Sequence, residues 1–316
     1  MASSPSAAPV ASLEELLSRA RAAGPRRLAV AAAESGSALS AAAEARRRGI
    51  AEPVLIGDAA EIRRRLTLLG EDPAGFEIVP VESDAAAARR AVAMVRAGEV
   101  AILMKGRLRT AELLHAVLDR QDGLRTGALL SDVMVADHPT AGQARILGLT
   151  DGGVNVAPGL QQKKAIVENA VELFHRLGYA APKVACLCAV ETVSPAMPHT
   201  EEARALSRMN ALGEIGGCLV SGPLALDNAL SAEAARQKGI DDPVAGWADI
   251  LLAPAIEAAN ALGKAFTYVG HCRVGHLVVG ARAPVLIPSR VDEAADKLNS
   301  IALGVLATSG GAGGQT

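Results

Sequence analysis

Short apolar runs alternate with longer amphipathic stretches along most of the chain, and this alternation limits the possible folds more than any other feature. The runs indicate strands, and the stretches between them carry apolar residues at helical spacing. Strands that are separated by helices predict parallel sheets with helices packed on both faces. In the first half the predicted strands are 27–33, 53–57, 78–81 and 100–104, and the predicted helices are an alanine-rich segment ending near Gly49, 59–69, 84–97 and 110–119.

The second half continues this pattern and adds a predicted antiparallel pair. The segments 128–135 and 146–156 have an extended pattern and a short link, which favours antiparallel pairing. An amphipathic helix is expected at 160–177, and Thr200 is expected to be the N-cap of the next helix. Further strands are expected at 183–190, 218–220, 250–253, 277–280 and 284–287, followed by a last helix from about 291 to 306.

The composition is that of a globular protein. Half of the 316 residues are hydrophobic but only 2% are aromatic, so the cores must be built from Ala, Val, Leu and Ile. A net charge of −2 without a basic cluster argues against a nucleic-acid partner, and no apolar run has the length that a membrane requires. The four cysteines match no zinc or redox spacing, so we expect buried thiols in a reducing, cytoplasmic setting.

The segment 283–296 carries the most informative pattern for chemistry. A strand is expected to end at Pro288, so that Ser289 and Arg290 lie where the last helix begins. A helix N-terminus offers unpaired N–H groups, Arg290 adds a fork of donors that matches phosphate, and Ser289 adds a hydroxyl. Asp296 follows Ser289 by seven residues, about two helical turns, so it should share a helix face with Ser289 and could act as a general base.

The same segment also has a purely structural interpretation. Ser289 can be an N-cap whose capping box is completed by Asp292, while Arg290 and Asp296 are surface charges. The spacing alone leaves both interpretations open.

Seven stretches of the chain, taken in order, resemble one known family. They are ILMKG at 102–106, LTDGGVNVAP at 149–158, PKVACLCAVE at 182–191, GPLALDNAL at 222–230, KGI at 238–240, SR at 289–290 and KLNSIAL at 297–303. Each stretch is weak alone, but their shared order is hard to explain by chance. Together they resemble the phosphate acetyl/butyryltransferase family over nearly the whole chain, and its butyryltransferase branch most closely.

The resemblance implies a phosphate acyltransferase, an enzyme that reversibly transfers a short acyl group between coenzyme A and inorganic phosphate to give an acyl-phosphate. Acyl-CoA and phosphate are then substrates, and no covalently bound cofactor or metal is expected. The resemblance also implies that Ser289 and Arg290 bind phosphate or the acyl-phosphate. In the acetyl branch an aspartate seven residues after that serine is held to deprotonate the CoA thiol, and Asp296 occupies this position. The butyryl branch need not carry an acid there.

The resemblance further implies a homodimer of chains that each form two α/β/α sandwich domains with a cleft between them, an architecture like that of isocitrate and isopropylmalate dehydrogenases. We expect the first domain at 1–147 with 287–316 and the second at 148–286. The chain departs from the common family pattern at 151–155 and 259–264. These departures concern the shape of the pocket, so acetyl, propionyl and butyryl all remain open as the acyl group.

Five more polar residues are candidates for the cleft. Lys105 ends a predicted strand just before Gly106, where α/β sheets bind ligands, although it could also be a surface lysine. The other candidates lie in or near the matching motifs and could instead satisfy backbone groups at turns. They are Asn155, Asp227, Asn260 and Lys264. Glu34, at a strand-to-helix turn, could help to contact a phosphate, or its segment could simply start a helix.

Two other functional classes are alternatives. A metal- and NAD-dependent decarboxylating dehydrogenase of similar fold would need clustered aspartates for its cation, and the sequence shows no such cluster. His271 and His276 are five residues apart and also lack metal spacing. A non-catalytic acyl-CoA-binding protein would bind CoA without turning it over.

Overall fold

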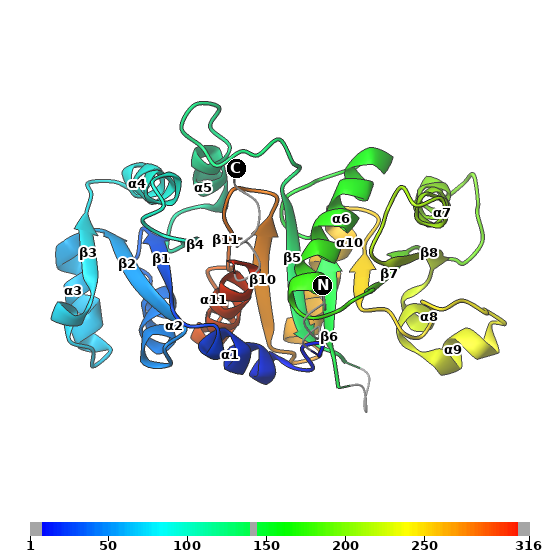
Figure 1. Ribbon diagram of the computed structural model, residues 1–316, viewed down its shortest axis with the longest axis horizontal. Helices are drawn as coiled ribbons and strands as arrows, with labels where there is room; N and C mark the ends of the chain where they lie inside the picture. The colour runs from blue at the N-terminus through cyan, green and yellow to red at the C-terminus, as the bar shows by residue number, and fades with distance from the viewer. Residues whose placement is uncertain (1–7, 140–143, 309–316) are drawn as a thin grey trace, which may run out of the picture. The chain divides into compact units, whose positions relative to one another are not determined.

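The computed structural model describes residues 8–139 and 144–308, and these residues form two compact units (Figure 1). The first unit contains residues 14–128 and the chain from Gly275 onward, and the second contains residues 129–274 and the chain up to Leu13. The domain boundaries expected from the sequence, after residues 147 and 286, differ from the limits of these units. The expected boundaries concern independently folding domains and stay a prediction.

The sheet of the first unit is mostly parallel, as predicted. Its strand order is β3-β2-β1-β4-β11-β10, in which only the β10–β11 pair is antiparallel. The chain moves outward from β1 to β3 and then returns to the other side of β1 with β4, so the winding direction reverses between β1 and β4. Ligands of open α/β sheets bind at such a switch point. The strands are β1 (Arg26–Ala31), β2 (Ala51–Gly57), β3 (Glu77–Pro80), β4 (Ile102–Lys105), β10 (Val274–Val279) and β11 (Val285–Leu286).

Helices cover both faces of this sheet. Right-handed crossovers place α2 and α3 on one face and α4 on the other. Helix α11 packs against α2, and α5 packs against α4, so each face has its own helical layer. The helices are α1 (Leu13–Ala22), α2 (Gly36–Arg47), α3 (Ala59–Leu68), the 3₁₀ turn η1 (Pro73–Gly75), α4 (Asp84–Arg96), α5 (Thr110–Val117) and α11 (Ala294–Thr308).

The second unit has a mixed sheet in the order β5-β6-β9-β7-β8. The β5–β6 pair is antiparallel, as the sequence predicts, and the remaining pairs are parallel. The core of this unit is built from Ala, Leu and Val, as the low aromatic content requires. Its strands are β5 (Ser131–Asp137), β6 (Ile146–Thr150), β7 (Lys183–Leu187), β8 (Leu219–Leu224) and β9 (Ile250–Leu252), and its helices are α6 (Leu160–Arg176), α7 (Pro198–Ala211), α8 (Leu226–Leu230), α9 (Ala232–Gln237) and α10 (Ile256–Tyr268).

The α/β class is therefore confirmed, while the predicted starts of two helices are wrong. Helix α7 begins at Pro198, so Thr200 is not its N-cap; it is buried in the first turn, where its hydroxyl donates to the carbonyl of Met197 at 2.7 Å. Helix α11 begins at Ala294 rather than near 291, because a separate hydrogen-bonded turn precedes it. None of the described helices is long and apolar enough to cross a membrane.

Candidate active site

Lys105 lies at the switch point of the first unit. It is the last residue of β4 and is 4% exposed. The next residue, Gly106, donates from its N–H to the carbonyl of Ala31 on β1 at 2.8 Å. A Cβ atom at Gly106 would lie 2.0 Å from the carbonyl oxygen of Ala32, so only glycine lets β4 end this close to β1. The motif at 102–106 thus places a buried cation at the carboxyl end of a central strand.

A tight turn that contains Ser289 and Arg290 lies next to the end of β4. It follows β11, which pairs with β4 in parallel. The Ser289 N–H donates to the carboxylate of Asp292 at 2.6 Å, and the Asp292 N–H donates to the Ser289 carbonyl at 3.2 Å. This is the backbone-to-carboxylate half of the expected capping box, but it closes before the helix rather than at its first residue. The expectation that Ser289 and Arg290 lie at a helix N-terminus is therefore wrong.

The buried side chain of Lys297 holds this turn. Lys297 is 2% exposed, and its Nζ donates to the carbonyls of Ser289 at 3.0 Å and Asp292 at 2.6 Å. Burial lowers the pKa of Lys297, and the negative charges of Asp292 and Asp296 oppose this shift. Lys297 is not among the candidates predicted from the sequence, although the KLNSIAL stretch begins with it. The signal available in the sequence is a lysine in a predominantly apolar last helix.

Lys105, Arg290 and Lys297 form one electrostatic cluster, which we call the cation cluster. Burial lowers the pKa of Lys105, and the positive charges of Arg290 and Lys297 lower it further, while Asp292 acts in the opposite direction. Three neighbouring cations disfavour one another unless an anion lies between them. Arg290 is exposed, so the cluster has a side open to a ligand. The arrangement is suited to a small polyanion such as phosphate.

Asp296 lies next to this cluster because it is close to Lys297 on α11, and not because it shares a helix face with Ser289. It is 7% exposed in the first turn of α11, and its charge acts on Lys297. Ser289 and Asp296 do not share a helix face, because Ser289 lies outside α11. The role of Asp296 as a base stays a prediction.

One of the predicted cleft residues, Asn155, lies in a loop of the second unit that is organised around Asp151. The buried carboxylate of Asp151 accepts hydrogen bonds from the N–H groups of Gly153, Val154 and Asn155. The amide of Asn155 donates to Asp151 at 2.5 Å and to the Leu130 carbonyl at 2.8 Å. Burial raises the pKa of Asp151, and Asp132 raises it further.

Asn260, on α10, supports the same loop. Its amide donates to the Gly152 carbonyl at 3.2 Å. For Asn155 and Asn260 the structure therefore shows the turn-satisfying contacts that were the alternative to a ligand contact.

The family model described as "Phosphate acetyl/butaryl transferase" matches residues 12–90 and 84–305. The chain belongs to this family. It is 42% identical to a phosphate butyryltransferase of Clostridium acetobutylicum over 94% of the chain and 98% of that protein. It is also 42% identical to a phosphate acetyltransferase of Thermotoga maritima over 92% and 98% respectively, so identity does not separate the two acyl groups.

A solved structure supports the fold of this family member. The crystal structure of a branched-chain phosphotransacylase from Enterococcus faecalis superposes with a TM-score of 0.78 at 30% identity. The match covers 90% of the chain and 99% of that structure.

Three of the stretches that carry the family resemblance meet in an ion cluster of the second unit. Lys238 bonds Glu191 at 2.6 Å and Asp227 at 3.0 Å, and Asn228 donates to Glu191 at 2.5 Å. Hydrogen bonding to Lys238 lowers the pKa of both carboxylates. The predicted residue Asp227 is thus already held by an ion pair at the surface. Lys264, the last candidate, is exposed and lies 5.9 Å from the ring of Tyr268.

The cysteines of this phosphate acetyl/butyryltransferase family member are free thiols. Burial raises the pKa of Cys186 to about 12 and the pKa of Cys188 and Cys218 to about 11. These thiols are therefore protonated at neutral pH and make poor nucleophiles. Among the described residues, no group of three or more His, Cys, Asp or Glu is placed to hold a metal ion.

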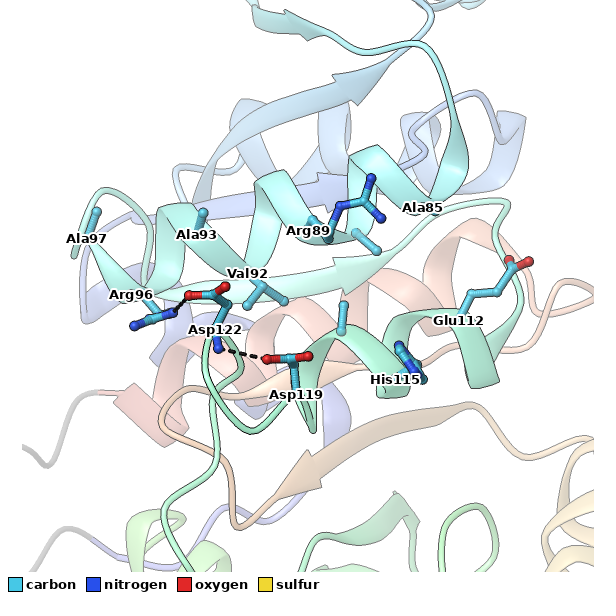
Figure 2. Close-up of a pocket in the computed structure, with 12 residues that line it drawn as sticks. Ala85, Arg89, Val92, Ala93, Arg96, Ala97, Glu112, His115, Asp119 and Asp122 are labelled. Atoms are coloured by element: carbon cyan, nitrogen blue, oxygen red, sulfur yellow. Dashed lines mark hydrogen bonds and ion pairs between the residues drawn. The ribbon is translucent and has the colours of Figure 1, made fainter.

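A cavity of about 650 Å³ lies between α4 and α5 (Figure 2), and no residue of the cation cluster lines it. Its wall includes alanine and valine side chains, and Arg96 at its edge pairs with Asp122 at 2.6 Å. The carboxylate of Asp119 accepts the N–H of Asp122 at 2.8 Å. The lining combines two arginines, Arg89 and Arg96, with three carboxylates, so it lacks the clustered positive charge that marks the end of β4.

Proposed function

We propose that the protein is a phosphate acyltransferase that moves a short acyl group reversibly between coenzyme A and inorganic phosphate. The observation that carries the proposal is the cation cluster of Lys105, Arg290 and Lys297, which interacts with the Ser289 turn at the switch point of a doubly wound sheet. Family membership supports the reaction class. The acyl groups considered are acetyl, propionyl and butyryl.

In the proposed reaction, phosphate or the acyl-phosphate binds to Ser289 and Arg290, and Lys105 adds a buried positive charge. Toward acyl-CoA, Asp296 accepts the thiol proton and the thiolate attacks the acyl carbonyl. The C–S bond forms, the bond to the phosphate oxygen breaks, and phosphate leaves. In reverse, a phosphate oxygen attacks the thioester carbonyl and the CoA thiolate leaves. Positioning and stabilisation of negative charge supply most of the rate.

The test is phosphate-dependent release of free CoA thiol from acetyl-, propionyl- and butyryl-CoA, without added metal or nicotinamide and with the protein's own thiols subtracted. Release that requires phosphate supports the proposal, and the fastest substrate names the acyl group. CoA binding without release from any thioester, at high protein concentration, would instead favour a non-catalytic acyl-CoA-binding protein.

The assembly and location are also proposals. A homodimer is supported by two large apolar side chains at the end of α10, Tyr268 and Val269, which are 58% and 78% exposed. Light scattering after size-exclusion chromatography tests it. A cytoplasmic location is supported by the four free cysteines, since free thiols are typical of reducing compartments.

A further inference from the structure

The chain makes an unfavourable turn after β1, next to the strand that ends in Lys105. Ala32 has a φ of 53°, a left-handed conformation that alanine rarely adopts. Its carbonyl accepts the N–H of Arg107 at 2.8 Å, and the N–H of Ala33 donates to the Ile56 carbonyl on β2 at 3.0 Å. Such a conformation persists only where the surrounding contacts hold it. Because Arg107 follows Lys105 by two residues, these contacts also hold the segment after β4.

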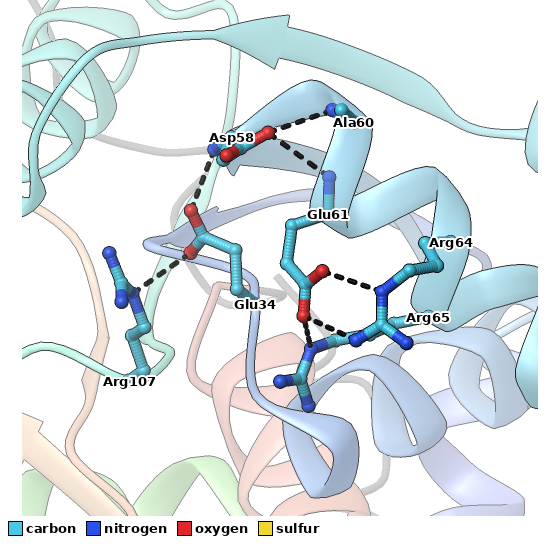
Figure 3. Close-up of polar contacts among 7 residues, drawn as sticks. All are labelled: Glu34, Asp58, Ala60, Glu61, Arg64, Arg65 and Arg107. Carbon is cyan, nitrogen blue, oxygen red and sulfur yellow. Dashed lines mark hydrogen bonds and ion pairs between the residues drawn. The ribbon is translucent and has the colours of Figure 1, made fainter.

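Glu34 is the buried carboxylate of this turn. It is 7% exposed, and its Oε1 accepts the N–H of Asp58, just after β2, at 2.6 Å (Figure 3). Its Oε2 is buried and accepts no hydrogen bond from the residues that the structure describes, but it forms an ion pair with Arg107, whose Nε lies 3.4 Å away. A Cβ at Gly57 would lie 2.5 Å from Oε1, so glycine makes room for this carboxylate. Glu34 thus connects the ends of β1 and β2 with the segment after β4.

Arg107 has a second carboxylate partner, which differs in burial. Its Nη2 donates to Asp84, in the first turn of α4, at 2.7 Å. The side chain of Asp84 is 31% exposed, whereas that of Glu34 is 6% exposed. A carboxylate that water can reach remains solvated when its partner is lost, but a buried one is left with an uncompensated charge. The pair between Glu34 and Arg107 is therefore the one that holds Arg107 against the end of β1.

We propose that Glu34 is a positioning residue for acyl transfer: by holding Arg107 against the end of β1, it fixes the end of β4 and keeps Lys105 within the cation cluster. This inference rests on the proposed function. Because the Glu34 carboxylate is buried and ion-paired, it acts through Arg107 and the backbone and not on a substrate. Without the ion pair, the segment after Lys105 keeps only its backbone bonds to the end of β1, from Gly106 and Arg107.

The test begins with phosphate saturation curves for the wild type and Glu34→Gln, in the direction that consumes acyl-CoA and phosphate. Glutamine keeps the shape of the side chain and an acceptor for the Asp58 N–H, but it removes the charge that Arg107 pairs with. The KM of phosphate should rise about tenfold, the loss expected for one interaction with a charged group. The KM of acyl-CoA and the thermal midpoint should stay near the wild-type values. A merely structural role would lower the thermal midpoint without this selective rise.

The pH dependence of the phosphate KM gives a second readout, whose direction is informative. Burial and the neighbouring Arg290 and Lys297 lower the pKa of Lys105, and the negative charge of Asp292 opposes this shift. When Lys105 leaves the cation cluster, its pKa returns toward the ordinary value, so in Glu34→Gln the rise of KM with pH should move to higher pH. A direct effect of removing a negative charge would lower the pKa of Lys105 and move this rise to lower pH.

Three further variants secure the result. Arg107→Gln should reproduce the higher phosphate KM and the shifted pH profile. The double variant Glu34→Gln/Arg107→Gln leaves no buried charge and should show an effect no larger than either single variant, because both substitutions remove the same ion pair. Asp84→Asn removes the more exposed partner of Arg107 and is the matched control, with kinetic constants like those of the wild type.

The inference is overturned by a wild-type phosphate KM in Glu34→Gln, by a pH profile that stays in place or moves to lower pH, or by effects that add in the double variant. The acyltransferase proposal stands after any of these results. A wild-type protein that releases no thiol from any acyl-CoA removes both.

Discussion

The buried Nζ of Lys297 donates a 3.0 Å hydrogen bond to the backbone carbonyl of Ser289. A second bond from the same Nζ, to the Asp292 carbonyl at 2.6 Å, ties the other end of the turn to α11. The position of Ser289 and Arg290 relative to Lys105 therefore depends on a side chain in the following helix.

Lys297→Met should loosen this turn, because the carbonyls of Ser289 and Asp292 lose their common donor. We expect kcat/KM for phosphate to fall at least tenfold, and the free energy of unfolding to fall by about 1–3 kcal/mol. Steady-state kinetics and urea unfolding measure the two effects. Lys164→Met, which removes a lysine paired within α6, is the control and should leave kcat/KM unchanged. Wild-type kinetics in Lys297→Met would show that the turn keeps its form without the lysine.

Arg290→Ala should raise the KM of phosphate by about ten- to a hundredfold, because a charge-assisted pair of hydrogen bonds is lost. Arg290→Lys keeps the charge without the planar fork and should fall between the wild type and the alanine variant. Phosphate saturation curves measure this. Arg282→Ala, at another exposed arginine of the same unit, is the control. An unchanged phosphate curve in Arg290→Ala contradicts the assignment of Arg290 to the anion.

Asp296→Asn should lower kcat by about 10²- to 10⁴-fold in the direction of acyl-CoA synthesis, with little change in the KM of phosphate or acyl-phosphate, if Asp296 takes the thiol proton. Stopped assays of acyl-CoA formation measure it. Glu293→Gln, at an exposed acid just before α11, is the matched control. Turnover at the wild-type rate in Asp296→Asn removes Asp296 from the mechanism.

The dependence of phosphate affinity on pH should report the protonation state of Lys105. Its pKa lies below 10.5 because of burial and of the neighbouring Arg290 and Lys297. The lysine is charged below this pKa and neutral above it, so the KM of phosphate should rise with pH in a range below that of an ordinary lysine. The assay runs from acyl-CoA and phosphate, where the CoA thiol is not a reactant.

Lys105→Arg should move this rise to higher pH, because a guanidinium stays charged throughout the range. An identical pH profile in the arginine variant would assign the titration to another group.

Local patterns predicted the elements of this fold well. The strand and helix alternation indicated the order from β1 to α5, and the apolar stripe at 160–177 indicated α6 (Leu160–Arg176). The short link before 146–156 indicated the antiparallel β5–β6 pair. These predictions succeeded because hydrophobic periodicity and connection length are properties of neighbouring residues.

Predictions from the sequence were wrong where a contact between separate segments sets the start of a helix or the role of a side chain. The start of α11 was misplaced because Asp292 closes a turn with Ser289 before the helix. Thr200 was misassigned because Pro198 begins α7 two residues earlier. Asn155 and Asn260 were placed in matching motifs, but only the structure shows that they support one loop.

The sequence by itself determined the α/β class, the family and the residues Ser289, Arg290 and Lys105 as candidates. Tertiary structure alone decided that Lys105 and Arg290 belong to one cation cluster, that Lys297 holds the Ser289 turn, and that Glu34 pairs with Arg107 beside the end of β4. The physical reason is that the field at a charged group depends on every charge and on the burial around it. Those neighbours come from strands and helices that are distant in sequence and meet only when the sheet forms.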